Sequence, residues 1–348
     1  MAEGLAVSLA VRVPRERGEE QRQRLRSLGL LRLDLRPLSE GPFLLLPVQD
    51  QARDALLGLE FTTASFAAQA LPQRYQDLAR VPEGLRALLP SSFDVVGDIV
   101  VVKLPLELEA HAAEVGRALL AAHKGARTVL LDRGVTGVER VRAVEVIAGE
   151  PSTVTEHVEH GARFRVDLAS CYFSPRLATE HARVAALAEQ GEVVLDLFAG
   201  VGPFAILIAK QGKAQRVYAV DLNPDAVQLI EENARLNKVQ DKVRAVLADA
   251  DAFAAQMEGQ GDRVIMNLPH SADAHWEQAL RACKERATIH YHKILDRTRV
   301  AEHVAELQAR ASQAGWDARL ALQREVRLYS PSQSHVALDW VVRRKPTA

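Results

Sequence analysis

VLDLFAGVGPF, residues 194–204, decides how the second half of the chain folds. Its apolar run predicts a buried strand that ends near Phe198, and Pro203 suits the first turn of a helix. Gly200 and Gly202 lie between the two, where they let the backbone turn tightly and approach a ligand. The start of the helix offers unpaired N–H groups at the same place. We therefore predict a strand, a ligand-binding turn and a helix.

Strand and helix patterns alternate from this stretch to the end of the chain. Apolar runs predict seven strands, at residues 192–198, 216–222, 243–249, 262–268, 287–295, 318–330 and 335–344. Helical segments separate the first six, whereas the last two follow one another directly. Repeated strand–helix units that close with a hairpin predict a Rossmann-like, mostly parallel seven-stranded sheet with one reversed strand.

Acidic residues at the ends of the predicted strands indicate the class of cofactor. The turn lacks the third glycine of the dinucleotide pattern, because Ala205 stands there. Asp221 ends the second strand, where it can accept hydrogen bonds from both ribose hydroxyls, and Asp249 ends the third, within reach of an adenine edge. Asp196 lies inside the first strand and would face a positively charged ligand. This set favours S-adenosylmethionine over a nicotinamide dinucleotide. The residues that we expect to bind it are Asp196, Phe198, Gly200, Gly202, Asp221, Leu222, Asp249 and Asn267.

Asn267 follows the fourth strand in the sequence MNLPH, at the edge where the sheet opens onto a ligand. Its amide can donate and accept hydrogen bonds at a nucleobase edge. It could instead cap the following helix. Amino-group methyltransferases stack a base on an aromatic residue after a similar motif, but this chain has His270 there.

Composition excludes several classes of protein. The chain has 348 residues, 48% of them hydrophobic, and a formal net charge of −1. No apolar run is long enough to cross a bilayer, and the first 21 residues do not resemble a signal peptide. Two cysteines, Cys171 and Cys283, make neither a disulfide framework nor a zinc motif, so we expect no metal and a reducing, cytoplasmic location.

The first half of the chain reads as smaller α/β units. A strand at residues 5–13, a helix rich in arginine and two short strands form the first, and another strand-rich passage begins near residue 92. The arginines of that helix could simply form a solvated face. We expect four parts, at residues 1–55, 56–90, 91–175 and 176–348: a small RNA-binding unit, a linker, a second RNA-binding unit and the cofactor-binding domain.

Motifs along nearly the whole chain resemble one family. They are SFDVVGDIVVVKLP, ERVRAVEVIAGE, YFSPRLATEHAR, VVLDLFAGVGPFAILIAK, VYAVDLNPDAV, ENARLNKV, DRVIMNLP and VRLYSP. In this order they resemble the archaeal–eukaryotic tRNA (guanine-37-N1)-methyltransferases. The resemblance implies a monomeric, class I S-adenosylmethionine-dependent enzyme whose partner is a tRNA with guanine at position 37, and no membrane partner.

The resemblance also implies roles for individual residues. Glu180 would be the general base, Arg140 would stabilise the guanine O6, and Asn267 would complete the catalytic set. The implied substrate contacts are Arg142, Tyr172, Phe173, Ser174, Pro175, Arg176 and Pro269. Many members have arginine after the base, where this chain has His181.

The chemistry calls for these groups independently. Guanine N1 carries a proton and is a poor nucleophile until a carboxylate removes it. The negative charge then spreads to O6, where a guanidinium can stabilise it.

Four other functions stay open from the sequence. A related enzyme of the wybutosine pathway transfers the aminocarboxypropyl group of the same cofactor, and other relatives methylate a modified guanine 37. A non-catalytic RNA-binding protein would not need Arg140, Glu180, Asp221 and Asn267 together. A methyltransferase of small molecules would not need the first 150 residues.

Overall fold

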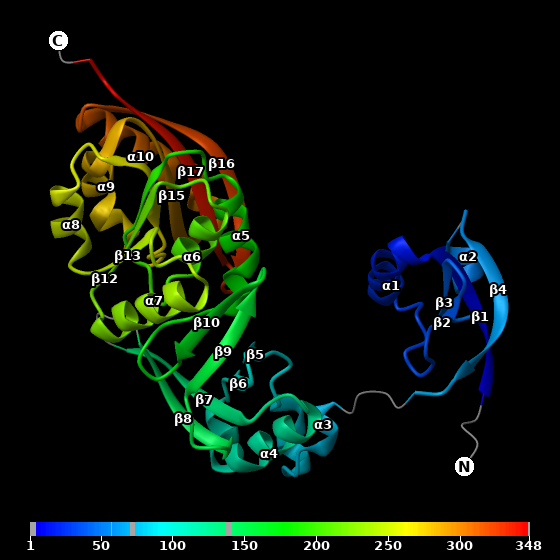
Figure 1. The fold of residues 1–348 in the computed structure, drawn as a ribbon. Coiled ribbons are helices and arrows are strands. Elements are labelled where there is room, and N and C mark those ends of the chain that lie inside the picture. The colour runs from blue at the N-terminus through cyan, green and yellow to red at the C-terminus, as the bar shows by residue number, and fades with distance from the viewer. Residues whose placement is uncertain (1–4, 57, 70–73, 137–140, 347–348) are drawn as a thin grey trace. The chain divides into compact units, whose positions relative to one another are not determined.

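The computed structural model describes residues 5–56, 58–69, 74–136 and 141–346. The chain divides into two compact units, Met1–Asp77 and Leu78–Ala348. Figure 1 labels the elements of both units.

The first unit is an antiparallel sheet covered by one helix. The strands have the order β2-β3-β1-β4, and Leu25 of α1 packs among Val11, Val13 and Leu46 of the sheet. We expected residues 56–90 to be a linker, but residues 60–67 form β4, which pairs along β1 from Leu5 to Arg12. The elements are β1 (Leu5–Pro14), η1 (Arg15–Arg17), α1 (Gly18–Ser27), β2 (Leu38–Glu40), β3 (Phe43–Pro47), α2 (Ala52–Ala55), β4 (Glu60–Ala67) and α3 (Tyr75–Leu78).

The second unit begins with a four-stranded sheet of order β5-β6-β7-β8, covered by α4, and continues with the hairpin β9–β10. Ile99 and Leu130 of that sheet share a core with Phe164 of the hairpin. The elements are η2 (Glu83–Leu88), β5 (Asp94–Val96), β6 (Ile99–Val102), η3 (Leu106–His111), α4 (Ala112–Ala122), β7 (Thr128–Thr136), β8 (Val141–Gly149), β9 (Val154–Glu159) and β10 (Ala162–Asp167).

The rest of the second unit is the predicted seven-stranded sheet. Its order is β13-β12-β11-β14-β15-β17-β16, and β17 alone runs against its neighbours, which confirms the prediction of one reversed strand. The elements are η4 (Pro175–Leu177), α5 (Ala178–Ala186), β11 (Val193–Asp196), α6 (Pro203–Lys210), β12 (Arg216–Asp221), α7 (Pro224–Leu236), β13 (Val243–Leu247), α8 (Ala250–Gln256), β14 (Gly261–Met266), η5 (Ala272–His275), α9 (Trp276–Ala282), β15 (Cys283–Asp296), η6 (Arg297–Arg299), α10 (Val300–Gln313), β16 (Trp316–Leu328) and β17 (Gln333–Arg344).

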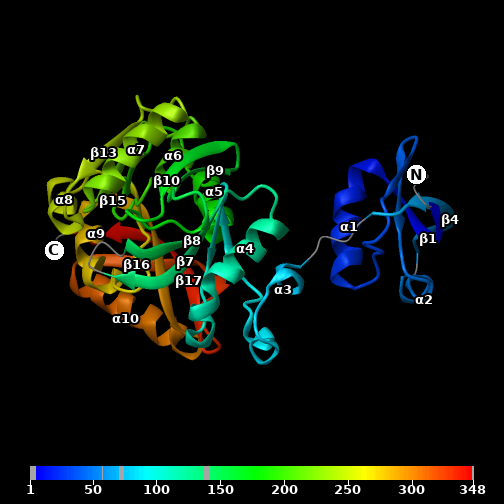
Figure 2. The ribbon, with the colours of Figure 1, turned by 90° about the horizontal axis from the view of Figure 1, so that it is seen from below.

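Helices cover both faces of this sheet. Helices α5, α6 and α7 contribute to one buried cluster and α8, α9 and α10 to the other, and Figures 1 and 2 show the two sets on opposite sides. Successive residues of β11 alternate between the clusters, since Val194 belongs to the first and Leu195 to the second. The carboxyl ends of the parallel strands therefore stay free for a site.

Asn233 of α7 and Asn237, the residue directly after α7, hold the hairpin against the sheet domain. Asn233 accepts a hydrogen bond from the backbone N–H of Arg165 (2.7 Å) and donates to its carbonyl (3.1 Å). Asn237, one turn later, makes the same pair of bonds with Arg163. Each side-chain amide thus bonds the backbone N–H and C=O groups of β10 that a neighbouring strand would otherwise pair with. The sequence ENARLN places the two asparagines four residues apart, on the same side of the helix.

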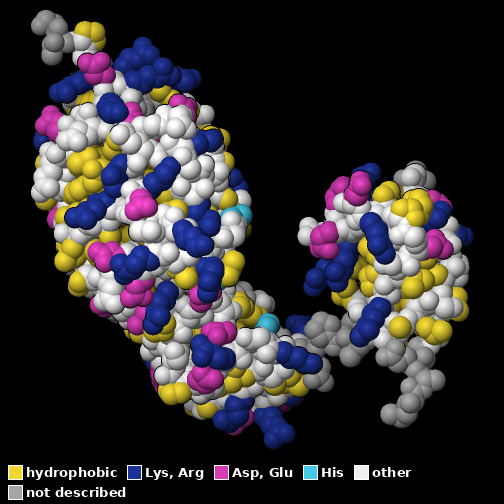
Figure 3. All heavy atoms as spheres, viewed as in Figure 1, with side chains coloured by type: hydrophobic (Ala, Val, Ile, Leu, Met, Phe, Trp, Pro, Cys, Tyr) yellow, Lys and Arg dark blue, Asp and Glu magenta, His cyan; other side chains and the backbone are white. Residues whose placement is uncertain are grey.

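The surface carries both signs of charge. Figure 3 shows Lys and Arg side chains interspersed with Asp and Glu on the visible face of each unit. None of the helices in the described ranges has the length and apolarity needed to span a membrane.

Candidate active site

The glycine turn after β11 has the backbone shape that only glycine adopts easily. Gly200 and Gly202 have φ angles of +55° and +86°, in the left-handed region. The Gly200 N–H donates to Oδ2 of Asp221 at 2.7 Å. A Cβ on Gly200 would meet the carbonyl oxygen of Tyr172 at 3.4 Å. The turn therefore joins the loop at Tyr172 to the end of β12.

Asp196, at the end of β11, is a buried carboxyl group that lacks a counter-charge. It is 0% exposed, and neither oxygen makes a hydrogen bond with any described residue. Burial, assisted by the nearby carboxylate of Asp221, raises the pKa of Asp196 to about 8. The backbone N–H groups of Phe198 and Ala205 approach the carboxyl group without the distance and angle of a hydrogen bond, and they offset only part of that effect. A cation would relieve this cost.

Asp221 shapes the next turn as well as facing the site. Its Oδ1 accepts from the N–H of Asn223 at 3.0 Å. Asn223 caps α7 through the N–H of Asp225 (2.9 Å) and donates to the carbonyl of Ser170 (2.7 Å). Leu222, which lies between Asp221 and Asn223 in the chain, is 49% exposed. An apolar surface therefore lies open directly beside the Asp221 carboxylate, as an adenosine site requires.

Asp249 has a structural task that the sequence analysis did not assign. Its Oδ1 caps α8 by accepting from the N–H groups of Asp251 and Ala252, both at 3.0 Å. Phe198 lies half-buried, with its ring 5.1 Å from that of His275. His275 in turn bonds Asp251 at 2.7 Å. His275 thus links Phe198 to the first turn of α8.

Asn267 follows β14, half-buried, and its Oδ1 has no hydrogen-bond partner among the described residues. The next helix begins at Ala272 with Ser271 before it, so Asn267 does not cap that helix. The carbonyl of Pro269 accepts from the N–H of Ile294 at 2.9 Å, which holds this loop against β15. An amide oxygen is therefore left available for a ligand.

The loop at residues 171–176 is held by charges from the four-stranded sheet. Arg142 of β8 donates to Asp132 (3.0 Å) and to the carbonyl of Phe173 (3.2 Å), and its guanidinium lies 5.3 Å from the ring centre of Tyr172. Arg176 donates to Asp94 at 2.6 Å. The SFD and YFSPR motifs are therefore neighbours in space.

The remaining residues of this loop differ in exposure. Phe173 is buried, with its ring 5.2 Å from that of His157, and Ser174 is buried with an Oγ that has no partner among the described residues. Pro175 begins η4 and is half-buried. The burial of Phe173 favours support of the loop over direct contact with a substrate.

Glu180, in the first turn of α5, is 1% exposed. Arg183 binds it through two hydrogen bonds, Nε to Oε2 at 2.9 Å and Nη2 to Oε1 at 2.6 Å. Because the side chain is covered, its contact with a guanine requires neighbouring residues to move on binding.

His181, at the position where many members of the resembled family have arginine, has a structural role in this chain. It is buried, its Nδ1 lies 2.8 Å from Glu159, and its ring is 4.6 Å from that of Phe204. It therefore joins β9 to α6 inside the protein. Arg140, which we expected beside O6, lies outside the described residues.

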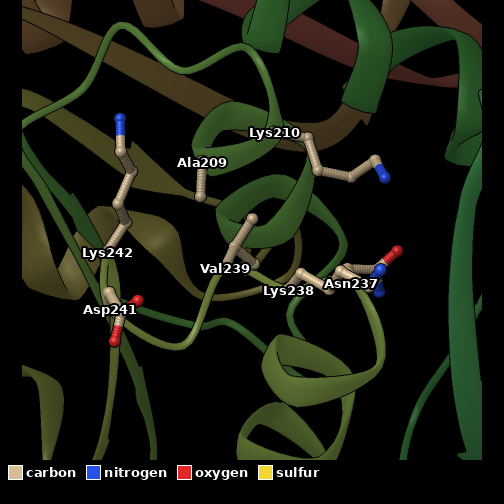
Figure 4. A pocket seen from close by; sticks show the side chains of 7 residues that line it. All are labelled: Ala209, Lys210, Asn237, Lys238, Val239, Asp241 and Lys242. Atoms are coloured by element: carbon tan, nitrogen blue, oxygen red, sulfur yellow. The ribbon is translucent and has the colours of Figure 1, made fainter.

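A separate hollow lies at the far end of α6, away from the glycine turn. Its lining residues are Ala209, Lys210, Asn237, Lys238, Val239, Asp241 and Lys242. Figure 4 shows the Lys210 and Lys242 side chains pointing apart, and Lys242 bonds the carbonyls of Gly212 and Ala214. The described residues contain no cluster of three His, Cys, Asp or Glu side chains that could hold a metal ion.

The residues at the carboxyl ends of β11 and β12 fit S-adenosylmethionine. The partnerless Asp196 suits its cationic end, and Asp221 with the exposed Leu222 suits its adenosine.

Comparison with known proteins agrees with this geometry. The TRM5/TYW2 methyltransferase domain matches residues 155–318, the TYW2 N-terminal domain residues 77–153, and the tRNA methyltransferase 5 N-terminal domain residues 10–56. The tRNA (guanine(37)-N(1))-methyltransferase Trm5b of Pyrococcus abyssi is 39% identical over 97% of this chain and 99% of its own. Its crystal structure matches with a TM-score of 0.73 over the same shares of the two chains.

Two further relatives bear on function. The solved complex of aTrm5 and tRNALeu is 32% identical, covers 96% of this chain and 99% of that one, and has a TM-score of 0.69. The tRNA(Phe) (4-demethylwyosine(37)-C(7)) aminocarboxypropyltransferase of Pyrococcus horikoshii is 32% identical over 74% of this chain and 92% of its own. With near-complete coverage by Trm5b and a matching catalytic domain, the chain belongs to the TRM5/TYW2 methyltransferase family.

Proposed function

We propose that this enzyme transfers the methyl group of S-adenosylmethionine to N1 of guanine 37 in tRNA. The observation that carries the proposal is the buried Asp196, whose partnerless carboxyl group ends β11 next to the glycine turn and to Asp221. A cationic nucleoside cofactor would place its positive charge beside the buried carboxyl group and its ribose beside Asp221. The match to tRNA methyltransferases over both units supports tRNA as the substrate.

In this proposal the bound cofactor supplies an electrophilic methyl group on a sulfonium. Asp196 faces its positive charge, Asp221 holds its ribose hydroxyls, and Leu222 and Phe198 flank its base. Gly200 and Gly202 let the backbone approach, and Asp249 orders the end of the pocket through the α8 cap.

The guanine is bound and activated by the other half of the site. Asn267 binds its edge through the available amide, and Pro269 fixes that loop. Glu180 takes the proton from N1, which leaves an electron pair on N1. That pair would accept the methyl group as the S–CH3 bond of the cofactor breaks and its electrons stay on sulfur. Arg140 stabilises the charge that develops on O6. Arg142, Tyr172, Ser174, Pro175 and Arg176 form the adjoining wall, with Phe173 beneath it.

The aminocarboxypropyl transfer of the wybutosine pathway is the second candidate, because that relative covers 74% of this chain. That match spans less of the chain than Trm5b does, and residues 10–56 match the N-terminal domain of tRNA methyltransferase 5. We therefore favour methyl transfer. We further propose that residues 1–55 and 91–175 grip the tRNA and that the enzyme acts as a cytoplasmic monomer.

Matched tRNA transcripts test the proposal. A transcript with guanine at position 37 should accept the labelled methyl group from the cofactor, and the same transcript with adenine 37 should accept none. Equal labelling of the two would refute the assignment of position 37. Label from the aminocarboxypropyl carbons, rather than from the methyl group, would instead establish the second candidate.

A further inference from the structure

A buried chain of charges runs from the proposed base across three strands. Arg183, which binds Glu180, also donates to Asp339 of β17 through Nη1 (2.6 Å) and Nη2 (3.1 Å). Asp339 lies 2.7 Å from Nδ1 of His290 on β15. The Nε2 of His290 lies 2.6 Å from Arg263 of β14. The arrangement ties α5 to the centre of the sheet.

The direction of these bonds follows from their partners. Arg263 can only donate, so Nε2 of His290 is an acceptor, and the histidine is neutral with its proton on Nδ1 toward Asp339. Burial raises the pKa of Asp339, but hydrogen bonds from His290 and Arg183 outweigh burial and hold it well below its usual range. Asp339 is thus a permanent anion that fixes Arg183 from the side opposite Glu180.

Strands β15, β16 and β17 bring three further titratable or charged side chains close to Glu180. His292 of β15 lies 3.9 Å from Oε1, Arg324 of β16 lies 3.9 Å from Oε2, and His335 of β17 follows His292 at 3.1 Å. Burial lowers the pKa of His292 and of His335 to about 3, so both are neutral near pH 7. Arg324 is 40% exposed, so solvent screens it. The close, desolvated cation at Glu180 is therefore Arg183.

Glu180 can serve as a base only as a carboxylate, and a carboxylate at 1% exposure needs a partner cation to offset the cost of its burial. We propose that Arg183, held by Asp339, is the positioning residue that keeps Glu180 ionised and aimed for the proton of guanine N1. The inference rests on the proposed function, because it gives Glu180 the role of base. In the step, the N1–H bond breaks, the proton passes to a Glu180 oxygen, and the electron pair stays on N1.

Two substitutions separate charge from packing. Arg183→Gln removes the cation but keeps a side chain that can hydrogen bond, whereas Arg183→Lys keeps the cation and loses the two-pronged geometry. Single-turnover methyl transfer to a guanine-37 transcript is measured against pH with the cofactor saturating. We expect the midpoint of the rate profile to rise by about one to three pH units in the Gln variant, so that the rate falls by roughly 10- to 1000-fold at pH values below the parental midpoint and recovers as pH rises. The Lys variant should keep the parental midpoint with a lower plateau.

A Gln variant that loses rate equally at every pH would overturn the inference, and so would a Lys variant whose midpoint rises as far. Should Arg183→Gln alone fail to fold at pH 8, the double variant Glu180→Gln/Arg183→Gln should be more stable than the single one, because it removes the buried Glu180 charge and leaves Asp339 with its hydrogen bond from His290. A double variant as unstable as the single one would also overturn it. Failure of the parent enzyme to form N1-methylguanine at position 37 would instead refute the proposed function. That result comes from the assay of the parent enzyme alone, so the two failures are distinguishable.

Discussion

Binding of S-adenosylmethionine should be coupled to the ionisation of Asp196. The carboxyl group is fully buried without a hydrogen-bond partner among the described residues, and its pKa is raised to about 8. The cofactor brings a sulfonium and, below about pH 8, an ammonium group, so it selects the ionised carboxylate. Binding below pH 8 must therefore release a proton.

The size of the effect follows from the ionised fraction of the free protein. With a pKa of about 8, Asp196 is about 1% ionised at pH 6.0 and about 24% ionised at pH 7.5. If the bound state is fully ionised, affinity rises roughly 20-fold over this interval, equivalent to about 2 kcal/mol. The cofactor's amino group stays mostly protonated in this range, which leaves Asp196 as the main source of the change.

Isothermal titration calorimetry at several pH values, in buffers with different heats of ionisation, measures both the affinity and the proton released. The matched control is Asp196→Asn, which should bind more weakly at pH 7.5 and lose most of the pH dependence. An affinity constant within twofold between pH 6.0 and 7.5, or the same slope in the Asn variant, would refute the reasoning.

The raised pKa has a second consequence for the free protein. Between about pH 4 and pH 8 the folded state holds a proton on Asp196 that the unfolded chain has already released. The contribution of this group to stability therefore falls as pH rises through that window. Thermal melts of the Asn variant should show less of that decline.

Three further changes probe the cofactor, the tRNA and the base. Asp221→Ala should weaken cofactor binding by about 1.5–3 kcal/mol, the cost of losing a charged hydrogen-bond partner; unchanged calorimetric affinity would remove Asp221 from the site. Deletion of the first unit, Met1–Asp77, should weaken tRNA binding and reduce its salt dependence while leaving cofactor affinity unchanged. Equal tRNA affinity with and without this unit would show that the first unit is only structural. Glu180→Gln should lower the single-turnover rate by roughly 10²–10⁴-fold with little change in either affinity; a parental rate would show that Glu180 is not the base.

The sheet and its reversed strand were predictable because periodicity carries them. Regular alternation of apolar runs and helices fixed the seven strands, and the glycine turn located the ligand edge between β11 and α6. The strand β4 was missed because residues 60–67 are only partly covered and directly precede a stretch broken by prolines at positions 72, 82 and 90. Its partner β1 is some fifty residues away, and pairing over that distance leaves no local signal.

The identity of the site residues was predictable from the sequence, whereas most of their hydrogen-bond partners were not. The acidic residues at strand ends were visible, but not that Asp249 caps α8 or that Asp196 lacks a partner among the described residues. The Arg183–Asp339 pair joins residues 156 positions apart, so only the folded chain brings it together. Asn233 was visible in the ENARLN motif, and the pair of opposite bonds that its amide makes with β10 gives that motif its physical meaning.

The most direct test of the central claim is the identity of the modified nucleoside. Guanine-37 tRNA transcript is incubated with the enzyme and S-adenosylmethionine, digested to nucleosides and to oligonucleotides, and analysed by chromatography and mass spectrometry. The account predicts N1-methylguanosine, located at position 37 and formed roughly 10²–10⁴-fold more slowly when the enzyme carries Glu180→Gln. A methyl group on another atom or nucleotide, or an aminocarboxypropyl adduct at position 37, would contradict it.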